Sequence, residues 1–278
     1  MQGSLKGLEC LQMVRADVET RCDEYDAVAT YTLPGVQNSG KYLFMPHARS
    51  MKQRGGLVPA DVYFLDYDDC FELVGAVSEL VDQIVDKSER YQTIYLDGVL
   101  CGAKVFAHAI IELHVRERQD VLDKIVFNSI NGVISPEDLK TTAFNAAKVL
   151  PAWLDPIMTL VLRQAHKAGR KKEAESYGML NDENIISLNE DANERISWRL
   201  LRSQVEAMSA PSPEFDKPIR IKKCVGVFSS EDDRIDNGFS YMSLTHLFDD
   251  VMYVEIDAGH STLAYQPDIW RRKFYEVW

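Results

Sequence analysis

The sequence lacks the features that mark secreted, membrane and zinc-binding proteins. It has only five cysteines, an odd number without a Cys-x-x-Cys pair, which predicts free thiols in a reducing compartment. No apolar run approaches the roughly 18–20 residues of a membrane span, and the first residues do not resemble a signal peptide. Neither metal-ligand spacing nor a phosphate-binding glycine-rich loop is present. We therefore expect a cytoplasmic protein with no metal and no cofactor.

Positive charge is outnumbered by negative charge, with 31 Lys and Arg against 43 Asp and Glu. The formal net charge is −12 and the isoelectric point is near 5.0, which disfavours binding to nucleic acid or to anionic membranes. One basic cluster, from Lys167 to Lys172, is followed at once by Glu173 and Glu175 and is typical of a solvated helix end. We expect no nucleic-acid partner and no membrane. The expected partner is a small molecule, and association into a homo-oligomer is left open.

What the sequence does contain is an alternation of short apolar runs with helical patterns. The first forty residues alternate apolar and polar positions over 8–18 and 25–33, which predicts an opening antiparallel hairpin or meander. Residues 71–89 and 103–117 then show helical spacing. This order predicts an α/β fold, a mostly parallel sheet with helices on both faces. The predicted buried strands are 41–45, 61–65, 93–96, 124–127, 224–228 and 251–256.

One segment breaks the alternation. Between about 135 and 210 only helical patterns occur, at 136–149, 151–168 and 194–208. We interpret this block as a helical cap inserted into the sheet domain; a separate helical domain is the alternative. The predicted division is a first core part at 1–134, the cap at 135–210 and a second core part at 211–278.

The most informative stretch is Gly98-Val99-Leu100-Cys101-Gly102-Ala103, which joins a predicted strand to a predicted helix. Small residues two positions before and two after Leu100 allow a strand and a helix to pass closely at a strained turn. This pattern resembles the nucleophile elbow of the α/β-hydrolase superfamily, in which an active enzyme carries Ser, Cys or Asp at the centre. The resemblance places Leu100 at the nucleophile position. A shift by one residue would instead present Cys101, and Asp97 is a weaker candidate.

The same family resemblance extends along the chain in the family's order. Residues 41–48 resemble the strand and loop that supply half of the oxyanion hole, which assigns His47 and Ala48 to the pocket beside Leu100 and Cys101, although no glycine follows His47. Residues 62–66 resemble the next strand. Residues 225–235 resemble the strand and loop of the triad acid, here Asp233, with Asp232 second. Gly259-His260 resembles the end of the last strand, which places His260 as the triad histidine.

These residues leave three hypotheses. Leu100 has neither a lone pair nor an acidic proton, so the covalent route of a serine hydrolase cannot start there. The preferred hypothesis is a degenerate family member that binds a small apolar or carbonyl-containing ligand, or a partner, without hydrolysing it. The second is a non-hydrolytic enzyme with a His260–Asp233 general base. The third is an ester or thioester hydrolase that uses another nucleophile, such as Cys101.

Overall fold

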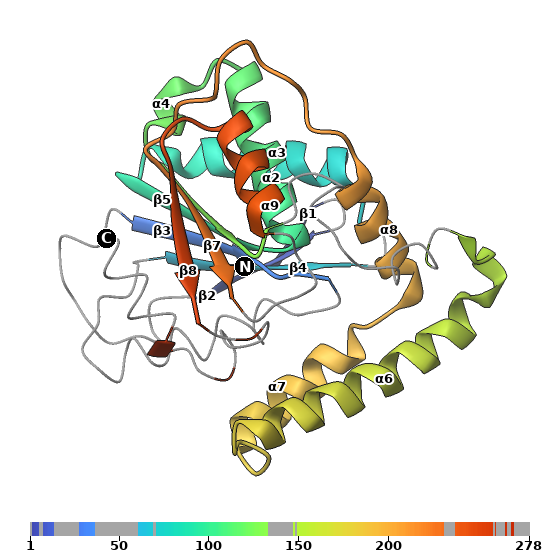
Figure 1. The fold of residues 1–278 in the computed structure, drawn as a ribbon. Helices are drawn as coiled ribbons and strands as arrows, with labels where there is room; N and C mark the ends of the chain where they lie inside the picture. Colours follow the sequence, from blue (N-terminus) through green and yellow to red (C-terminus); the bar gives the residue numbers. More distant parts are fainter. Residues whose placement is uncertain are drawn as a thin grey trace.

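The computed structural model describes residues 2–5, 8–13, 28–36, 61–68, 71–132, 147, 149–230, 237–257, 259, 265 and 268–269 (Figure 1). The expected strand at 41–45 and the site residues His47, Ala48, Asp233 and His260 lie outside the described residues.

The centre of the fold is a sheet in which eight strands are described. Their order is β1-β2-β4-β3-β5-β6-β7-β8. The first two, β1 and β2, pair antiparallel at one edge, and the other six run parallel to one another, which confirms the mostly parallel sheet. The strands are β1 (Gln2–Leu5), β2 (Leu8–Met13), β3 (Val28–Leu33), β4 (Asp61–Tyr67), β5 (Thr93–Val99), β6 (Ile125–Ile130), β7 (Lys223–Ser229) and β8 (Val251–Ile256).

The opening of the chain differs from the prediction in one respect. The stretches around 8–13 and 28–33 do not pair with each other, because β2 pairs with β1 and β4, whereas β3 lies between β4 and β5. In β3, threonines alternate with apolar residues, a pattern that is typical of a strand with one face in solvent. Thr30 and Thr32 are in fact buried, and the Thr32 hydroxyl donates to the Tyr63 carbonyl at 3.3 Å. A satisfied hydroxyl makes threonine acceptable inside a parallel sheet.

Three helices cover one face of this sheet: α2 (Leu73–Ser88), α3 (Cys101–Val115) and α9 (Asn237–Leu247) (Figure 1). The strand register pairs Gly98 with Ser129 and Ser129 with Gly226, so these positions share a face. Gly98 lies against Ala103 of α3, and Gly226 lies against Leu244 of α9. The short helix α4 (Gln119–Leu122) leads into β6.

The remaining described helices all fall between β6 and β7. They are the 3₁₀ turn η4 (Ala152–Leu154) and the helices α6 (Asp155–Ser176), α7 (Glu183–Glu194) and α8 (Trp198–Ser209). Helix α7 was not predicted, because its acidic and amide side chains obscure the apolar period. Helix α8 packs on α3, whereas α6 and α7 pair with each other away from the sheet (Figure 1). The predicted division into core and cap remains a prediction.

Candidate functional site

The turn between β5 and α3 has an unusual backbone. Leu100 adopts φ 48° and ψ −112°, a combination that side chains other than glycine rarely adopt. Its N–H donates to the carbonyl of Ile130 in β6 at 3.1 Å, and its side chain is only 8% exposed. Such backbone strain persists only where the surrounding structure enforces it.

The flanking glycines explain how the structure enforces this turn. A Cβ atom at Gly98 would lie 2.6 Å from the backbone nitrogen of Ala103, and one at Gly102 would lie 2.3 Å from the carbonyl oxygen of Leu33. Both distances are far below a van der Waals contact with backbone that cannot move aside. Strand β5, helix α3 and the end of β3 therefore approach more closely than any residue larger than glycine permits.

The side chain of Leu100 lies against the segment that follows β3. A Cβ atom at Gly35 would lie only 2.9 Å from Leu100 Cδ1. The preceding carbonyl, of Pro34, accepts a hydrogen bond at 3.1 Å from the Tyr67 hydroxyl of β4, which fixes this segment against the sheet. Gly35 was not among the predicted site residues, although a glycine two residues after the end of a buried strand is a signal that could have pointed to it.

Cys101 points into the protein interior. It is fully buried, and its Sγ lies 3.9 Å from the Gln204 carbonyl of α8. Burial raises the pKa of the thiol to about 12, and a hydrogen bond with Tyr67 and the nearby charge of Lys104 only partly oppose this shift. Because the thiolate is the reactive form of cysteine, this environment favours packing over nucleophilic attack.

Two more polar side chains follow on the same helix. Lys104 is fully buried, and its Nζ donates to the Ala210 carbonyl at 2.7 Å and to the Ser212 hydroxyl at 3.1 Å. His108 lies one turn further on, and burial together with the charge of Lys104 lowers the pKa of its imidazole to about 4. Lys104 thus fastens the segment after α8 to α3, and His108 is neutral at physiological pH.

Asp97 lies on the opposite face of the sheet from α3. Successive strand residues point to opposite faces, and its neighbour Gly98 faces α3. Asn128 Nδ2 donates to the Asp97 carboxylate at 2.6 Å, and burial nevertheless raises the pKa of this carboxyl to about 7. The described partner of the Asp97 carboxylate is thus Asn128 of the neighbouring strand β6.

The carboxyl ends of β6, β7 and β8 are tied together by side chains. Asn131 Nδ2 donates to the Ser229 hydroxyl at 2.9 Å, and the Ser229 N–H donates to Asn131 Oδ1 at 2.7 Å. The Ser229 hydroxyl reaches the Gly259 carbonyl at 3.4 Å, and the Ser230 hydroxyl reaches Asp257 at 3.0 Å. The segments leading to Asp233 and His260 therefore begin at neighbouring points, on the edge of the sheet where β5 ends. The geometry of those two residues with Leu100 remains a prediction.

Within the described part of the chain, no group of three or more His, Cys, Asp and Glu side chains is arranged to hold a metal ion. Among the helices described, none combines the length and apolar character needed to cross a bilayer.

Solved structures with the same architecture identify the fold. An enol-lactonase from Burkholderia xenovorans aligns over 99% of this chain and 98% of its own, with a TM-score of 0.61 and 13% identity. An esterase from Thermogutta terrifontis aligns over 100% and 97% (TM-score 0.58, 10% identity), and the type II thioesterase BorB of the borrelidin cluster aligns over 90% and 91% (0.53, 15%). The chain has the α/β-hydrolase fold.

This likeness concerns architecture alone. No protein-family model and no curated protein matches the sequence. At identities of 10–15%, a shared fold does not establish a shared activity, because function resides in the side chains that the fold carries.

Proposed function

We propose that this chain is a degenerate α/β-hydrolase-fold protein in which the turn at Leu100 is the nucleophile elbow without a nucleophile. In this proposal it binds a small acyl or other carbonyl-containing ligand and does not hydrolyse it through a covalent intermediate. The observation that carries the proposal is the backbone of Leu100, at φ 48° and ψ −112° between β5 and α3. In an active enzyme, such a strained strand-to-helix turn exposes the attacking atom.

A leucine gains nothing from this conformation. Strain of this kind costs on the order of 1–3 kcal/mol and is retained where a function depends on it. The glycines at 98 and 102 permit the close backbone approach at this turn, whatever side chain residue 100 carries. These features support a turn built for a nucleophile whose side chain has been replaced.

The surroundings of Leu100 suggest the kind of ligand. Gly35, two residues after the end of β3, lies against the leucine side chain. Residues 35–36 are therefore our candidates for the first half of an oxyanion hole. They take the place of His47 and Ala48, which the family resemblance suggested and which lie outside the described residues. The tied ends of β7 and β8 support the placement of Asp233 and His260 at the same edge. The similar structures include an esterase, a thioesterase and a lactonase. An ester, thioester or lactone is therefore the ligand class to test first.

The most direct test places a nucleophilic hydroxyl oxygen at residue 100. Leu100→Ser should introduce labelling by a fluorophosphonate probe and a burst of p-nitrophenol from p-nitrophenyl butyrate, while the wild type shows neither. Leu100→Ala is the matched control, since it also removes the side-chain bulk but adds no nucleophile. Adding His260→Ala to Leu100→Ser should abolish the gained reactivity. If Leu100→Ser folds, as judged by circular dichroism, and stays inert, the elbow assignment is wrong.

The same assays distinguish the alternatives. Turnover of thioesters by the wild type with an acyl adduct on Cys101, found by mass spectrometry, would overturn the proposal in favour of a cysteine hydrolase. Turnover without any adduct that disappears in His260→Ala would favour a general-base enzyme. The buried position of Cys101 and the raised pKa of its thiol are arguments against the first of these outcomes.

A further inference from the structure

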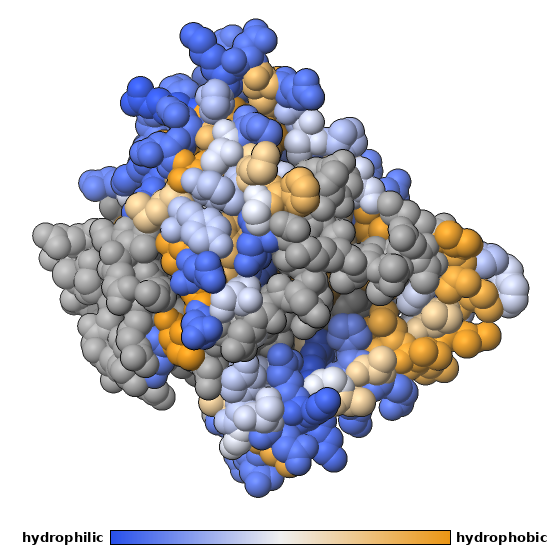
Figure 2. All heavy atoms as spheres, in the orientation of Figure 1, coloured by the Kyte–Doolittle hydropathy of each residue, from blue (hydrophilic) through white to orange (hydrophobic). Residues whose placement is uncertain are grey.

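The outer face of α6 carries bulky apolar side chains that the fold leaves in solvent. Trp153 in η4 is 74% exposed, and Ile157, Leu160 and Val161 along the first half of α6 are 57%, 64% and 55% exposed. Val149, just before this segment, is 80% exposed. Figure 2 shows a group of hydrophobic residues on the side of the molecule where α6 begins in Figure 1. We call Trp153, Ile157, Leu160 and Val161 the bulky half of the α6 face.

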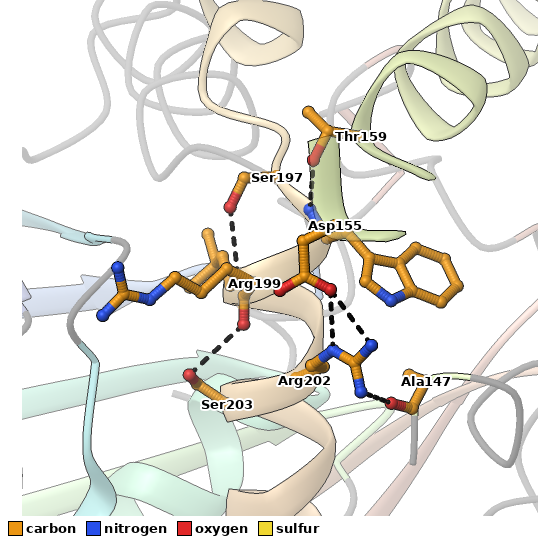
Figure 3. Close-up of polar contacts among 9 residues, drawn as sticks. Ala147, Asp155, Thr159, Ser197, Arg199, Arg202 and Ser203 are labelled. Carbon is orange, nitrogen blue, oxygen red and sulfur yellow. Dashed lines mark hydrogen bonds and ion pairs between the residues drawn. The ribbon is translucent and has the colours of Figure 1, made fainter. Parts of the chain in front are cut away.

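The orientation of α6 is fixed, because polar contacts with other segments hold the side of the helix opposite the exposed apolar residues. The Asp155 carboxylate pairs with the Arg202 guanidinium of α8 at 3.0 Å, and the Thr159 hydroxyl accepts the backbone N–H of Trp198 at 2.9 Å (Figure 3). Further along, Arg163 donates to the Ile196 carbonyl at 2.9 Å. The exposed apolar side is thus a fixed feature of the helix.

Along the second half of the same face, the side chains are mostly alanines at first and then lysines. On a helical projection, Gln164, Ala165 and Ala168 continue the stripe of Ile157 and Val161, and all of them are exposed. Lys171 and Lys172 follow on the same face and are exposed as well. We call Gln164, Ala165, Ala168, Lys171 and Lys172 the small half of the α6 face.

We propose that the α6 face binds a second copy of this chain, with the two α6 helices antiparallel about a two-fold axis. A symmetric interface must be complementary to itself, and antiparallel pairing satisfies this requirement here. It places the bulky half of one copy on the small half of the other, with Ile157 opposite Ala168 and Leu160 opposite Ala165. Small residues let the two helices approach closely, so that the large side chains fill the space between them.

The positions of the lysines and the apolar area of the α6 face both agree with binding of a second copy of the chain. The pairing brings Lys172 of one copy to Trp153 of the other, where an ammonium group over an indole is favourable. The four side chains of the bulky half, exposed to this degree, present on the order of 500 Å² of apolar surface, which is the size of a patch that marks an interaction site. With the small half added, the face approaches the roughly 800 Å² per subunit that a stable dimer buries. A membrane fits less well, because the net charge of −12 repels anionic lipid.

Sedimentation velocity over a concentration series tests the proposal. The wild type should form a dimer, and the double variant Ile157→Glu/Leu160→Glu should weaken it by at least about 100-fold in Kd, since central apolar contacts dominate interfaces. Phe239→Glu, at an exposed apolar position on α9, is the matched control and should leave the dimer intact. All these sites are exposed, so unchanged circular dichroism and melting of the monomer are expected.

A second variant distinguishes the specific helix pairing from non-specific hydrophobic association. Ala168→Trp enlarges the apolar surface but fills the place that Ile157 of the partner needs, so it should also dissociate the dimer. A wild type that stays monomeric, or a dimer that Ala168→Trp strengthens or that Phe239→Glu abolishes, would overturn the proposal. Cosedimentation of a monomeric wild type with phosphatidylcholine–phosphatidylserine vesicles, lost in Ile157→Glu/Leu160→Glu, would assign the face to a membrane instead. None of these outcomes depends on the proposed ligand-binding function.

Discussion

Helices α3 and α6 differ in how much of their surface the rest of the molecule covers. Eleven of the fifteen residues of α3 are buried, including a lysine, whereas α6 buries only Arg170 and Ala174 among twenty-two. Helix α3 starts at a backbone contact with β3 and runs along the sheet. Helix α6 is held on one side by the Asp155–Arg202 ion pair and by hydrogen bonds. The candidate site is therefore built on a helix that the sheet and α8 cover, whereas α6 leaves most of its described surface in solvent.

The largest effect should come from introducing a polar group into α3. Ile110 is fully buried, so Ile110→Gln places an amide in an apolar environment and should lower the free energy of unfolding by about 4 kcal/mol or more. Ile157→Gln, the same change on the outer face of α6, should alter the stability of the monomer by less than about 0.5 kcal/mol. Urea unfolding at low protein concentration measures both. Equal losses would show that the α6 face is covered within the monomer.

Replacing a glycine by alanine should destabilise the protein in α3 and stabilise it in α6. In Gly102→Ala the new methyl group would meet the Leu33 carbonyl, and we expect a loss of at least about 3 kcal/mol together with distortion of the turn at Leu100. Gly169 of α6 has no heavy atom within 4 Å of its Cβ position. Gly169→Ala should therefore stabilise the protein by about 0.5–1 kcal/mol, as an alanine usually does in a helix. Thermal and urea unfolding check both; a harmless Gly102→Ala would refute the close approach of β3.

Asp97 should make the stability of the sheet depend on pH. The folded state holds the proton up to a pKa of about 7, whereas an unfolded aspartate releases it near 3.9. The stability contributed by this group is therefore fully present below about pH 4 and is lost as the pH rises through 7. Between pH 5 and 8 the wild type should lose roughly 2–3 kcal/mol relative to Asp97→Asn.

Urea unfolding of both proteins at pH 5 and pH 8 measures this difference. Glu175→Gln, at an exposed carboxylate of α6, is the control and should follow the wild type. Parallel pH dependence of the wild type and Asp97→Asn would show that the Asp97 carboxyl is ionised in the folded protein at pH 5.

The smallest expected effect is the difference in stability between replacing a buried lysine and replacing an exposed one. Lys104→Met retains the length of the side chain but leaves the Ala210 carbonyl without its donor, which should cost about 1–3 kcal/mol. Lys167→Met on α6 should change stability by less than about 0.5 kcal/mol. Denaturant midpoints check both. A stabilised Lys104→Met would mean that the cost of burying the ammonium group exceeds the value of its hydrogen bonds.

Much of the fold could be predicted because buried parallel strands leave a strong local signal. The expected runs at 61–65, 93–96, 224–228 and 251–256 fall within β4, β5, β7 and β8, and the run at 124–127 overlaps β6. The order of strands in the sheet carries no such signal. Strand β3 was therefore placed beside the wrong neighbour, although its residues were recognised as extended.

The candidate site was predictable to a similar degree. The glycines around Leu100 are a local pattern, and the positive φ of the leucine agrees with the close turn that they suggest. The contact with Gly35 joins residues 65 positions apart, so neither periodicity nor motif spacing points to it. Asp233 and His260 rest on family order, and their placement beside Leu100 stays a prediction.

By itself, the sequence determined the alternation of strands and helices, the glycine-flanked turn and the absence of a nucleophilic atom at Leu100. These follow from side-chain volume, hydrophobic period and the atoms that each residue type carries. Only the tertiary structure decided that Cys101 lies buried under α8, that Gly35 lies against Leu100, and that one apolar stripe of α6 faces water. An apolar stripe looks the same in the sequence whether the chain covers it or not, because burial depends on what distant segments pack against it.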